Sequence, residues 1–280
     1  MHQSVAVIIP TFNRAYSLAR ALDSVYSQSR AANEVVVVDD GSTDETREFI
    51  KHNYPDVIYL YQSNKGVSAA RNYGIKNSVS SLVAFLDSDD EWLPEKLELQ
   101  LNALADNPNY SLVHSDEIWI RRGVRVNQMD KHKKRGGKLF NYCLPLCVIS
   151  PSSVLMTRQL LLEVDGFDED LVACEDYDMW LNICCKYSVL FIDQPLLRKY
   201  GGHEDQLSAQ HWGMDRFRVR ALEKLINSAK LSEEQTRKSK DMLITKSRIL
   251  KNGASKRGNT ERADYYQELI RKYSDEIQES

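Results

Sequence analysis

Short apolar runs alternate with amphipathic segments over the first 110 residues of the chain. The runs are rich in Val, Ile and Leu, and each precedes a segment whose apolar positions recur at helical spacing. The predicted strands are 5–10, 34–40, 57–62 and 81–87, and a helix is predicted after each of them. Strands that are apolar on both faces and alternate with helices indicate a mostly parallel sheet with helices on both sides. The pattern therefore predicts an α/β fold.

The rhythm changes after residue 110. Apolar runs at 111–120, 152–157 and 189–193 predict further strands, and 175–187 has helical spacing with Trp180 on its apolar, core-facing side. The polar and basic stretch 121–138 predicts a mobile, solvated loop, or one that orders over an anionic ligand. From about residue 212 the chain consists of charged amphipathic segments. We predict one domain over 1–210, divided near residue 110, and a C-terminal helical extension over 211–280.

The composition of the chain limits which partners and which cellular compartment we expect. The formal net charge of −3 argues against nucleic-acid binding. There is no run of about 18 apolar residues and no signal-peptide pattern, so we expect a cytoplasmic protein. The number of cysteines is odd and their spacing fits neither a disulfide framework nor a zinc site, which predicts reduced structural thiols. These cysteines are Cys143, Cys147, Cys174, Cys184 and Cys185.

Polar and acidic residues directly follow three of the predicted strands. The sequences are PTFNR at 10–14, DDGS at 39–42 and DSDD at 87–90. In an open parallel sheet the carboxyl ends of the strands share one edge, where ligands bind. Mg²⁺ and Mn²⁺ take carboxylate and phosphate oxygens, so several carboxylates there suit a metal that binds a diphosphate. One such cluster would more simply cap a helix, but three clusters at strand ends favour the metal.

Five motifs follow one another along the chain: PTFNR, VVVVDDGSTDET, NKGVSAARNYG, FLDSDDEW and EDYDMWL. Together, over residues 5–208, they resemble glycosyltransferase family 2, whose members have the GT-A fold. The resemblance implies an inverting transferase that moves a sugar from a nucleotide-diphosphate sugar, most often a UDP-sugar, to an acceptor hydroxyl. It also implies that 1–110 is the nucleotide-binding half and 111–210 the acceptor-binding half. Because the chain has no QxxRW-type segment, we expect addition of a single sugar.

The resemblance assigns a first group of residues to the nucleotide sugar. Asp39 matches the residue that accepts a hydrogen bond from the uracil imide, and Asp87 matches the one on the ribose side. Asp40 is either a ligand contact or a turn residue before Gly41. Arg71 contacts the diphosphate or forms an ion pair between strand ends. The expected set is Pro10, Thr11, Asn13, Arg14, Asp39, Asp40, Lys65, Gly66, Ala69, Arg71, Asp87 and Ser88.

A second group is assigned to the metal. The resemblance implies Mn²⁺ or Mg²⁺ on Asp89, with His203 as a ligand of the metal or of phosphate. Asp90 is a further ligand or a helix cap. Arg198 and Lys199 are candidates for phosphate contact.

A third group is assigned to catalysis. Asp176 matches the catalytic base that removes the proton of the acceptor hydroxyl, and Glu175 is the second choice. The plainer alternative is that both are acids favoured by the dipole at a helix N-terminus.

The sequence fits more than one partner and more than one function. The expected acceptor is a glycan or a lipid-linked glycan, so peripheral association with the inner face of a membrane is consistent with the sequence. The C-terminal helices suit packing or a homodimer better than lipid insertion. A non-catalytic nucleotide-sugar-binding relative and a nucleotidyltransferase are the alternatives. The latter usually has a Gly-rich loop after the first strand, which PTFNRAYS lacks. Glucose, galactose, N-acetylhexosamine and rhamnose donors all fit the sequence.

Overall fold

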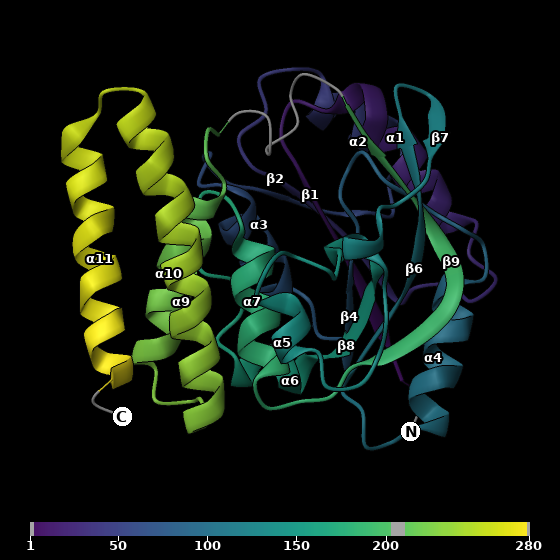
Figure 1. Cartoon of the computed structure of the whole chain (residues 1–280). Coiled ribbons are helices and arrows are strands. Elements are labelled where there is room, and N and C mark those ends of the chain that lie inside the picture. Colours follow the sequence, from purple (N-terminus) through teal and green to yellow (C-terminus); the bar gives the residue numbers. More distant parts are fainter. Residues whose placement is uncertain (1–2, 203–210, 279–280) are drawn as a thin grey trace.

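A single twisted sheet forms the centre of the computed structural model, which describes residues 3–202 and 211–278 (Figure 1). The strand order is β3-β2-β1-β4-β8-β6-β9-β5, and β7 pairs with β6. The strands are β1 (Val5–Thr11), β2 (Glu34–Asp39), β3 (Ile58–Tyr61), β4 (Leu82–Phe85), β5 (Glu91–Trp92), β6 (Leu112–Arg121), β7 (Val124–Val126), β8 (Val154–Thr157) and β9 (Leu190–Gly201).

The N-terminal part of the sheet is parallel, as the alternating pattern predicts. Ile8 of β1 lies opposite Val36 of β2 on one side and Phe85 of β4 on the other. The helices between these strands are α1 (Ala15–Tyr26), α2 (Thr46–Asn53) and α3 (Val67–Lys76). Since the first four strands run in one direction, their carboxyl ends meet at one edge. The expected α/β class is confirmed.

Antiparallel pairs extend the sheet beyond β4. Strand β8 is antiparallel to both β4 and β6, whereas β9 runs parallel to β6 along most of its length. The remaining elements of this part are α4 (Lys96–Asp106), the short 3-10 helix η1 (Asp130–His132), α5 (Phe140–Cys143), the second 3-10 helix η2 (Pro151–Ser153), α6 (Arg158–Glu163) and α7 (Glu175–Cys184).

Two apolar layers cover the faces of the sheet, because successive side chains of a strand point to opposite sides. Val7 and Ile9 pack on one face with Leu18 and Leu22 of α1. Ile8 belongs to the other layer, which also contains residues of α3, α7 and the C-terminal helices. Trp180 is 1% exposed, which confirms its predicted place in the core. Strand β3 lies at the edge of the sheet and is partly exposed, so the expectation that both of its faces are covered was wrong.

The C-terminal helices are α9 (Asp215–Asn227), α10 (Glu233–Lys256) and α11 (Thr260–Gln278). They stand side by side beyond α7 (Figure 1). Ser232 and Gln235 begin α10 with a reciprocal capping box, which satisfies two backbone donors at the helix start. Leu222 of α9 is fully buried in the same apolar layer as α7. The domain division at residue 210 and a homodimer through these helices stay predictions.

The predicted loop over 121–138 is partly wrong. Strand β7 and η1 lie within it, and Lys134 is buried. The ammonium of Lys134 lies 3.1 Å from a carboxylate oxygen of Glu117 and donates to the carbonyl of Val148 at 2.8 Å. These partners compensate the loss of solvation, so this basic residue does not lie in solvent. No helix within residues 3–202 and 211–278 has the length and apolar character needed to cross a bilayer.

Gly74 provides a test of the packing between α3 and the parallel strands. A Cβ at this position would lie 2.5 Å from a methyl carbon of Ile8 and 3.1 Å from one of Val38. We expect Gly74→Ala to lower the free energy of unfolding by about 1–3 kcal/mol through overpacking. Urea denaturation of the purified protein measures this loss.

Gly253 is the matched control, since it also lies within a helix. A Cβ there would meet only the flexible end of the Arg257 side chain. Gly253→Ala should therefore stabilise the protein by roughly 0.5–1 kcal/mol through helix propensity. Equal stability changes for the two variants would contradict the packing at Gly74.

Candidate active site

The loops after β1 and β2 are tied together by Asn13. Its backbone has a φ of 52°, in the left-handed region that Asn tolerates better than most residues. The side-chain carbonyl of Asn13 accepts hydrogen bonds from the amides of Thr43 at 2.7 Å and Asp44 at 3.3 Å. The amide of Asn13 donates to the hydroxyl of Ser42 at 2.8 Å. Asn13 therefore shapes the edge on which the predicted nucleotide residues lie.

Asp39 and Asp40 are both buried at the end of β2. Asp39 accepts hydrogen bonds from the amide of Ser42 at 2.8 Å and the hydroxyl of Tyr59 at 2.6 Å. Asp40 accepts from the amides of Lys65 and Gly66, each at 2.8 Å. Asp40 thus fixes the start of α3, a structural role different from the predicted turn before Gly41.

The remaining residues of the nucleotide group lie at the same strand ends or along α3. Gly66 immediately precedes α3 with a φ of +92°, a conformation that side-chain-bearing residues rarely adopt. Pro10, Thr11, Ala69 and Ser88 are buried, whereas Lys65 is exposed. The structure therefore gathers this predicted group at one end of the sheet.

Arg71 joins three segments that are distant in the sequence. One guanidinium nitrogen lies 2.7 Å from Asp87, directly after β4, and another lies 2.7 Å from Glu175, the first residue of α7. Arg71 is 2% exposed, and its guanidinium lies 5.0 Å from the centre of the Phe167 ring. Arg71 thus forms an ion pair, but it does so from within α3 and not from a strand end, and the pair extends to the acidic residues of α7.

The pKa values of the two ion-pair partners of Arg71 shift in opposite directions. Burial alone would raise the pKa of Asp87, but Arg71 and Lys199 lower it below its ordinary value. Burial and the adjacent Asp176 raise the pKa of Glu175 despite the guanidinium. Since Glu175 is buried and bound to Arg71, its neighbour Asp176 is the better placed of the two to meet a substrate.

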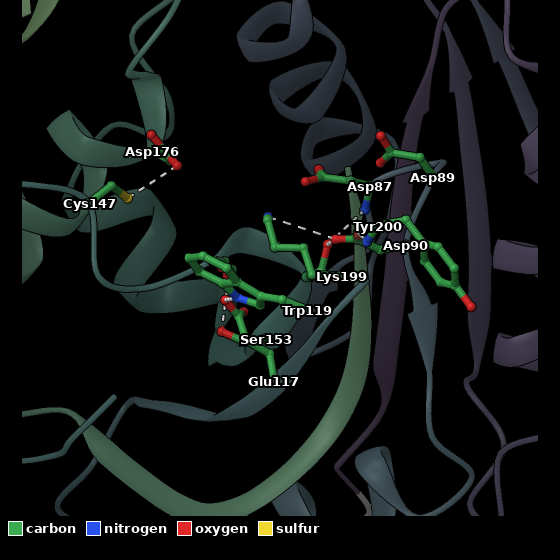
Figure 2. Close-up of polar contacts among 12 residues, drawn as sticks. Asp87, Asp89, Asp90, Glu117, Trp119, Cys147, Ser153, Asp176, Lys199 and Tyr200 are labelled. Atoms are coloured by element: carbon green, nitrogen blue, oxygen red, sulfur yellow. Dashed lines mark hydrogen bonds and ion pairs between the residues drawn. The ribbon is translucent and has the colours of Figure 1, made fainter. Parts of the chain in front are cut away.

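Asp176 is half-buried in the first turn of α7. One of its carboxylate oxygens accepts from the amide of Tyr177 at 2.7 Å, and the other accepts from the thiol of Cys147 at 3.1 Å. Figure 2 shows Asp176 and Cys147 on one side and the aspartates that follow β4 on the other, with Lys199 and Trp119 between them. The contact with Cys147 was not predicted, because no sequence signal links a cysteine at this distance to the acidic pair.

The aspartates that follow β4 are paired with basic side chains. Asp89 lies 2.6 Å from the guanidinium of Arg14, and its backbone carbonyl accepts from Arg20 at 2.5 Å. Asp90 accepts from the hydroxyl of Ser152 at 2.7 Å and the amide of Tyr200 at 3.0 Å. Asp90 is not a helix cap, because these bonds direct it toward β9 and α4 begins only at Lys96.

Lys199 of β9 lies among these carboxylates. Its ammonium is 3.9 Å from Asp90. Burial alone would lower the pKa of Lys199, but Asp90, Asp87, Glu117 and Asp89 raise it instead. Burial raises the pKa of Asp90 to about 8, with Lys199 opposing this change and Asp89 and Asp87 adding to it. Glu117 was not predicted, although an acid among the apolar positions of SLVHSDEIWI was a signal for it.

The residues present suit a divalent cation that is shared with substrate. Within the described ranges, no set of three or more His, Cys, Asp or Glu side chains gathers around a common point. Mg²⁺-type ions are often held by one or two carboxylates together with substrate phosphates. Asp89 is partly exposed and fits that role. His203, the other predicted ligand, lies outside the described residues.

A comparison with protein-family models matches residues 6–162, more than half of the chain, to "Glycosyl transferase family 2". The chain belongs to glycosyltransferase family 2. It is 34% identical over 194 residues to an uncharacterized glycosyltransferase of Rickettsia felis, covering 69% of this chain and 32% of that one. The family 2 chain thus spans only about a third of the length of this relative.

The match to another relative covers a larger part of that relative's length. The chain is 32% identical over 181 residues to the UDP-Glc:alpha-D-GlcNAc-diphosphoundecaprenol beta-1,3-glucosyltransferase WfgD of Escherichia coli. This match covers 64% of the family 2 chain and 69% of WfgD.

Solved structures share the fold at low sequence identity. TarS 1–349 of S. aureus in complex with UDP-GlcNAc has a TM-score of 0.66 and 18% identity, covering 96% of this chain and 92% of that one. The mannosyltransferase PcManGT of Pyrobaculum calidifontis, in complex with GDP-Man and Mn²⁺, has a TM-score of 0.63 and 19% identity, covering 98% and 83%. The expected GT-A fold of the family 2 chain is confirmed.

The buried pair of Glu117 and Lys134 makes the stability of the chain depend on pH. Burial alone would raise the pKa of Glu117, but Lys134, Lys199 and the indole of Trp119 lower it to about 2. A lowered carboxyl pKa stabilises the fold fully above the unfolded value near 4.5, and this contribution disappears as the pH falls toward 2.

We expect Glu117→Gln to lower the free energy of unfolding by about 3–5 kcal/mol at pH 7, since Lys134 then stays buried without a carboxylate. The difference from the unmodified protein should shrink below pH 4.5. Denaturation with urea at intervals between pH 7 and pH 3.5 measures both. Glu234→Gln, in an exposed pair with Lys238, is the control and should change nothing measurable. A loss at Glu117 that is independent of pH would refute the ion-pair account.

Proposed function

We propose that this family 2 chain is an inverting glycosyltransferase that moves one sugar from a UDP-sugar to a hydroxyl of a lipid-linked diphosphate glycan. The observation that carries the proposal is the double ion pair of Arg71, 2.7 Å from both Asp87 and Glu175. This pair brings the aspartates after β4 and the acidic pair of α7 into one site. Such a site has the two parts that direct displacement requires, namely groups for the leaving diphosphate and a base for the acceptor.

Asp176 is proposed as the base. It takes the proton of the acceptor hydroxyl while the hydroxyl oxygen bonds to the anomeric carbon and the bond from that carbon to the diphosphate oxygen breaks. A base for this reaction must face the side opposite the leaving group. Asp176 lies across from Asp87 and Asp89 in Figure 2, which supports that role. Glu175 is proposed to position the helix start through Arg71.

The diphosphate side is proposed to combine Lys199, Arg14 and Asp89. Lys199 stays charged among the carboxylates, and a charged amine stabilises a leaving phosphate. Asp89 would hold the divalent cation, which supplies further charge neutralisation when bound. The complex of PcManGT with GDP-Man and Mn²⁺ supports this part of the proposal.

The donor and acceptor classes are supported by the relatives. WfgD is named for UDP-Glc and a diphosphoundecaprenol acceptor, and TarS was solved with UDP-GlcNAc. Asp39 is proposed to accept a hydrogen bond from the uracil imide, which a cytosine ring nitrogen cannot donate. An acceptor of this kind would bring the protein to the inner face of a membrane.

The proposed roles of Asp176 and Asp89 can be distinguished by measuring both sugar transfer and nucleotide binding. Asp176→Asn should lower sugar transfer from UDP-sugars at least about 100-fold, the usual contribution of a general base. Calorimetric affinity for UDP with Mn²⁺ should remain unchanged in that variant. Asp89→Asn should weaken UDP binding with Mn²⁺, and EDTA should weaken UDP binding to the unmodified protein.

Asp170→Asn is the control, because Asp170 is exposed and paired only at the surface with Arg220. It should leave transfer and UDP affinity unaltered. Full turnover of Asp176→Asn would remove Asp176 as the base. Tighter binding of GDP or dTDP than of UDP would contradict the proposed donor, and binding of no nucleotide would contradict the transferase itself.

A further inference from the structure

Cys147 is a thiol next to the proposed base that the reaction described above does not use. It lies between α5 and η2, and its sulfur is 3.1 Å from the Oδ2 atom of Asp176 (Figure 2). The same sulfur is 3.2 Å from the carbonyl oxygen of Ile149, which is a second acceptor for the single thiol proton, but the charged carboxylate is the stronger acceptor of the two. It is half-buried, unlike Cys143, Cys174 and Cys184, which are buried.

We infer that Cys147 is a positioning residue: its thiol donates a hydrogen bond to Asp176 and holds that carboxylate in the orientation needed to receive the acceptor proton. This inference rests on the proposed function. It deepens the account of the base by adding a residue that none of the motifs contains.

Each carboxylate oxygen of Asp176 accepts one hydrogen bond, one from Tyr177 and the other from Cys147. The Oδ1 atom accepts from the amide of Tyr177 at 2.7 Å, so the thiol on Oδ2 fixes the plane of the carboxylate. A carboxylate oxygen has lone pairs for more than one hydrogen bond, which leaves room for the acceptor hydroxyl. Without the thiol, the Asp176 side chain could rotate away from the line of attack.

The segment that carries Cys147 is itself anchored to buried groups. The hydroxyl of Tyr177, on the same helix as Asp176, donates to the carbonyl of Leu144 at 2.6 Å. Lys134 donates to the carbonyl of Val148 at 2.8 Å. The thiol and the carboxylate therefore sit on elements that are fixed to each other, as a positioning contact requires.

The Cys147 thiol is protonated, as a hydrogen-bond donor must be. Burial and the Asp176 carboxylate raise the pKa of the Cys147 thiol well above its ordinary value, so the sulfur keeps its proton. The Asp176 carboxylate also contributes to the raised pKa of Glu175 and of Cys174.

The first arm of the test measures the contact without enzymatic activity. Iodoacetamide alkylation of each cysteine is followed at pH 8 by peptide mass spectrometry in the unmodified protein and in Asp176→Asn. Removal of the carboxylate charge should favour the thiolate and speed alkylation of Cys147 about 3–10-fold. Cys185, which is also half-buried and donates to the carbonyl of Asn182, is the internal control and should react at an unchanged rate.

The second arm compares Cys147→Ser, Cys147→Ala and Cys147→Val in the transfer assay. The hydroxyl of Ser keeps a donor, so kcat should stay within about twofold. Ala and Val lose the donor, so kcat should fall about 3–10-fold with the KM for the donor sugar unchanged. Cys185→Ala is the control and should match the unmodified enzyme.

The outcomes separate this inference from the proposed function. If Val and Ala keep kcat while Ser loses activity, Cys147 is a packing residue and the inference is wrong. If alkylation of Cys147 does not change in Asp176→Asn, the contact is absent and the inference is also wrong. If the unmodified protein transfers no sugar, the proposed function fails, while the alkylation arm still decides whether the thiol contacts Asp176.

Discussion

Burial of the Arg71 guanidinium is the constraint on which the site depends. A charged group that is 2% exposed is stable only if it is paired and hydrogen-bonded, and Arg71 has carboxylate partners in Asp87 and Glu175. Those partners come from the end of β4 and the start of α7. The requirement to pair this single charge therefore forces the two acidic motifs of the chain together at the carboxyl edge of the sheet.

The same principle extends along that edge, where carboxylates and cations are interleaved. Asp89 pairs with Arg14, and Asp90 lies near Lys199. The cations offset part of the negative charge of the loop after β4, and burial reduces it further by raising the pKa of Asp90 to about 8. Under the proposed function, an incoming diphosphate meets Arg14 and Lys199, while Glu175 stays bound to Arg71. Asp176 can then act as a base because its neighbour carries the structural ion pair, and Cys147 holds it in place.

The pattern of apolar residues along the chain predicted the helices and strands well. The partners of the charged residues could be known only from the folded structure. The helix at Ala15–Tyr26 and the first parallel strands follow from apolar periodicity, and the shared edge follows from the parallel strand order. Arg71 and Glu175 are 104 positions apart, so the choice between an ion pair and a ligand contact could not be made from spacing. Lys134 looked like part of a solvated basic run because its partner, Glu117, lies on a strand outside that run. Whether a charged residue can be buried depends on partners that are distant in the sequence. The thiol contact of Asp176 likewise depends on a distant residue.

The most direct test of this account is a double-mutant cycle between Arg71 and Glu175, measured as the free energy of unfolding in urea. Arg71→Met alone should cost about 3–5 kcal/mol, because it leaves two buried carboxylates without their cation. Combining it with Glu175→Gln should cost less than the sum of the two single changes by about 2 kcal/mol, since one of those carboxylates is then neutral. Additivity within about 0.5 kcal/mol would contradict the account, because it would mean that Arg71 does not join α7 to the strand ends.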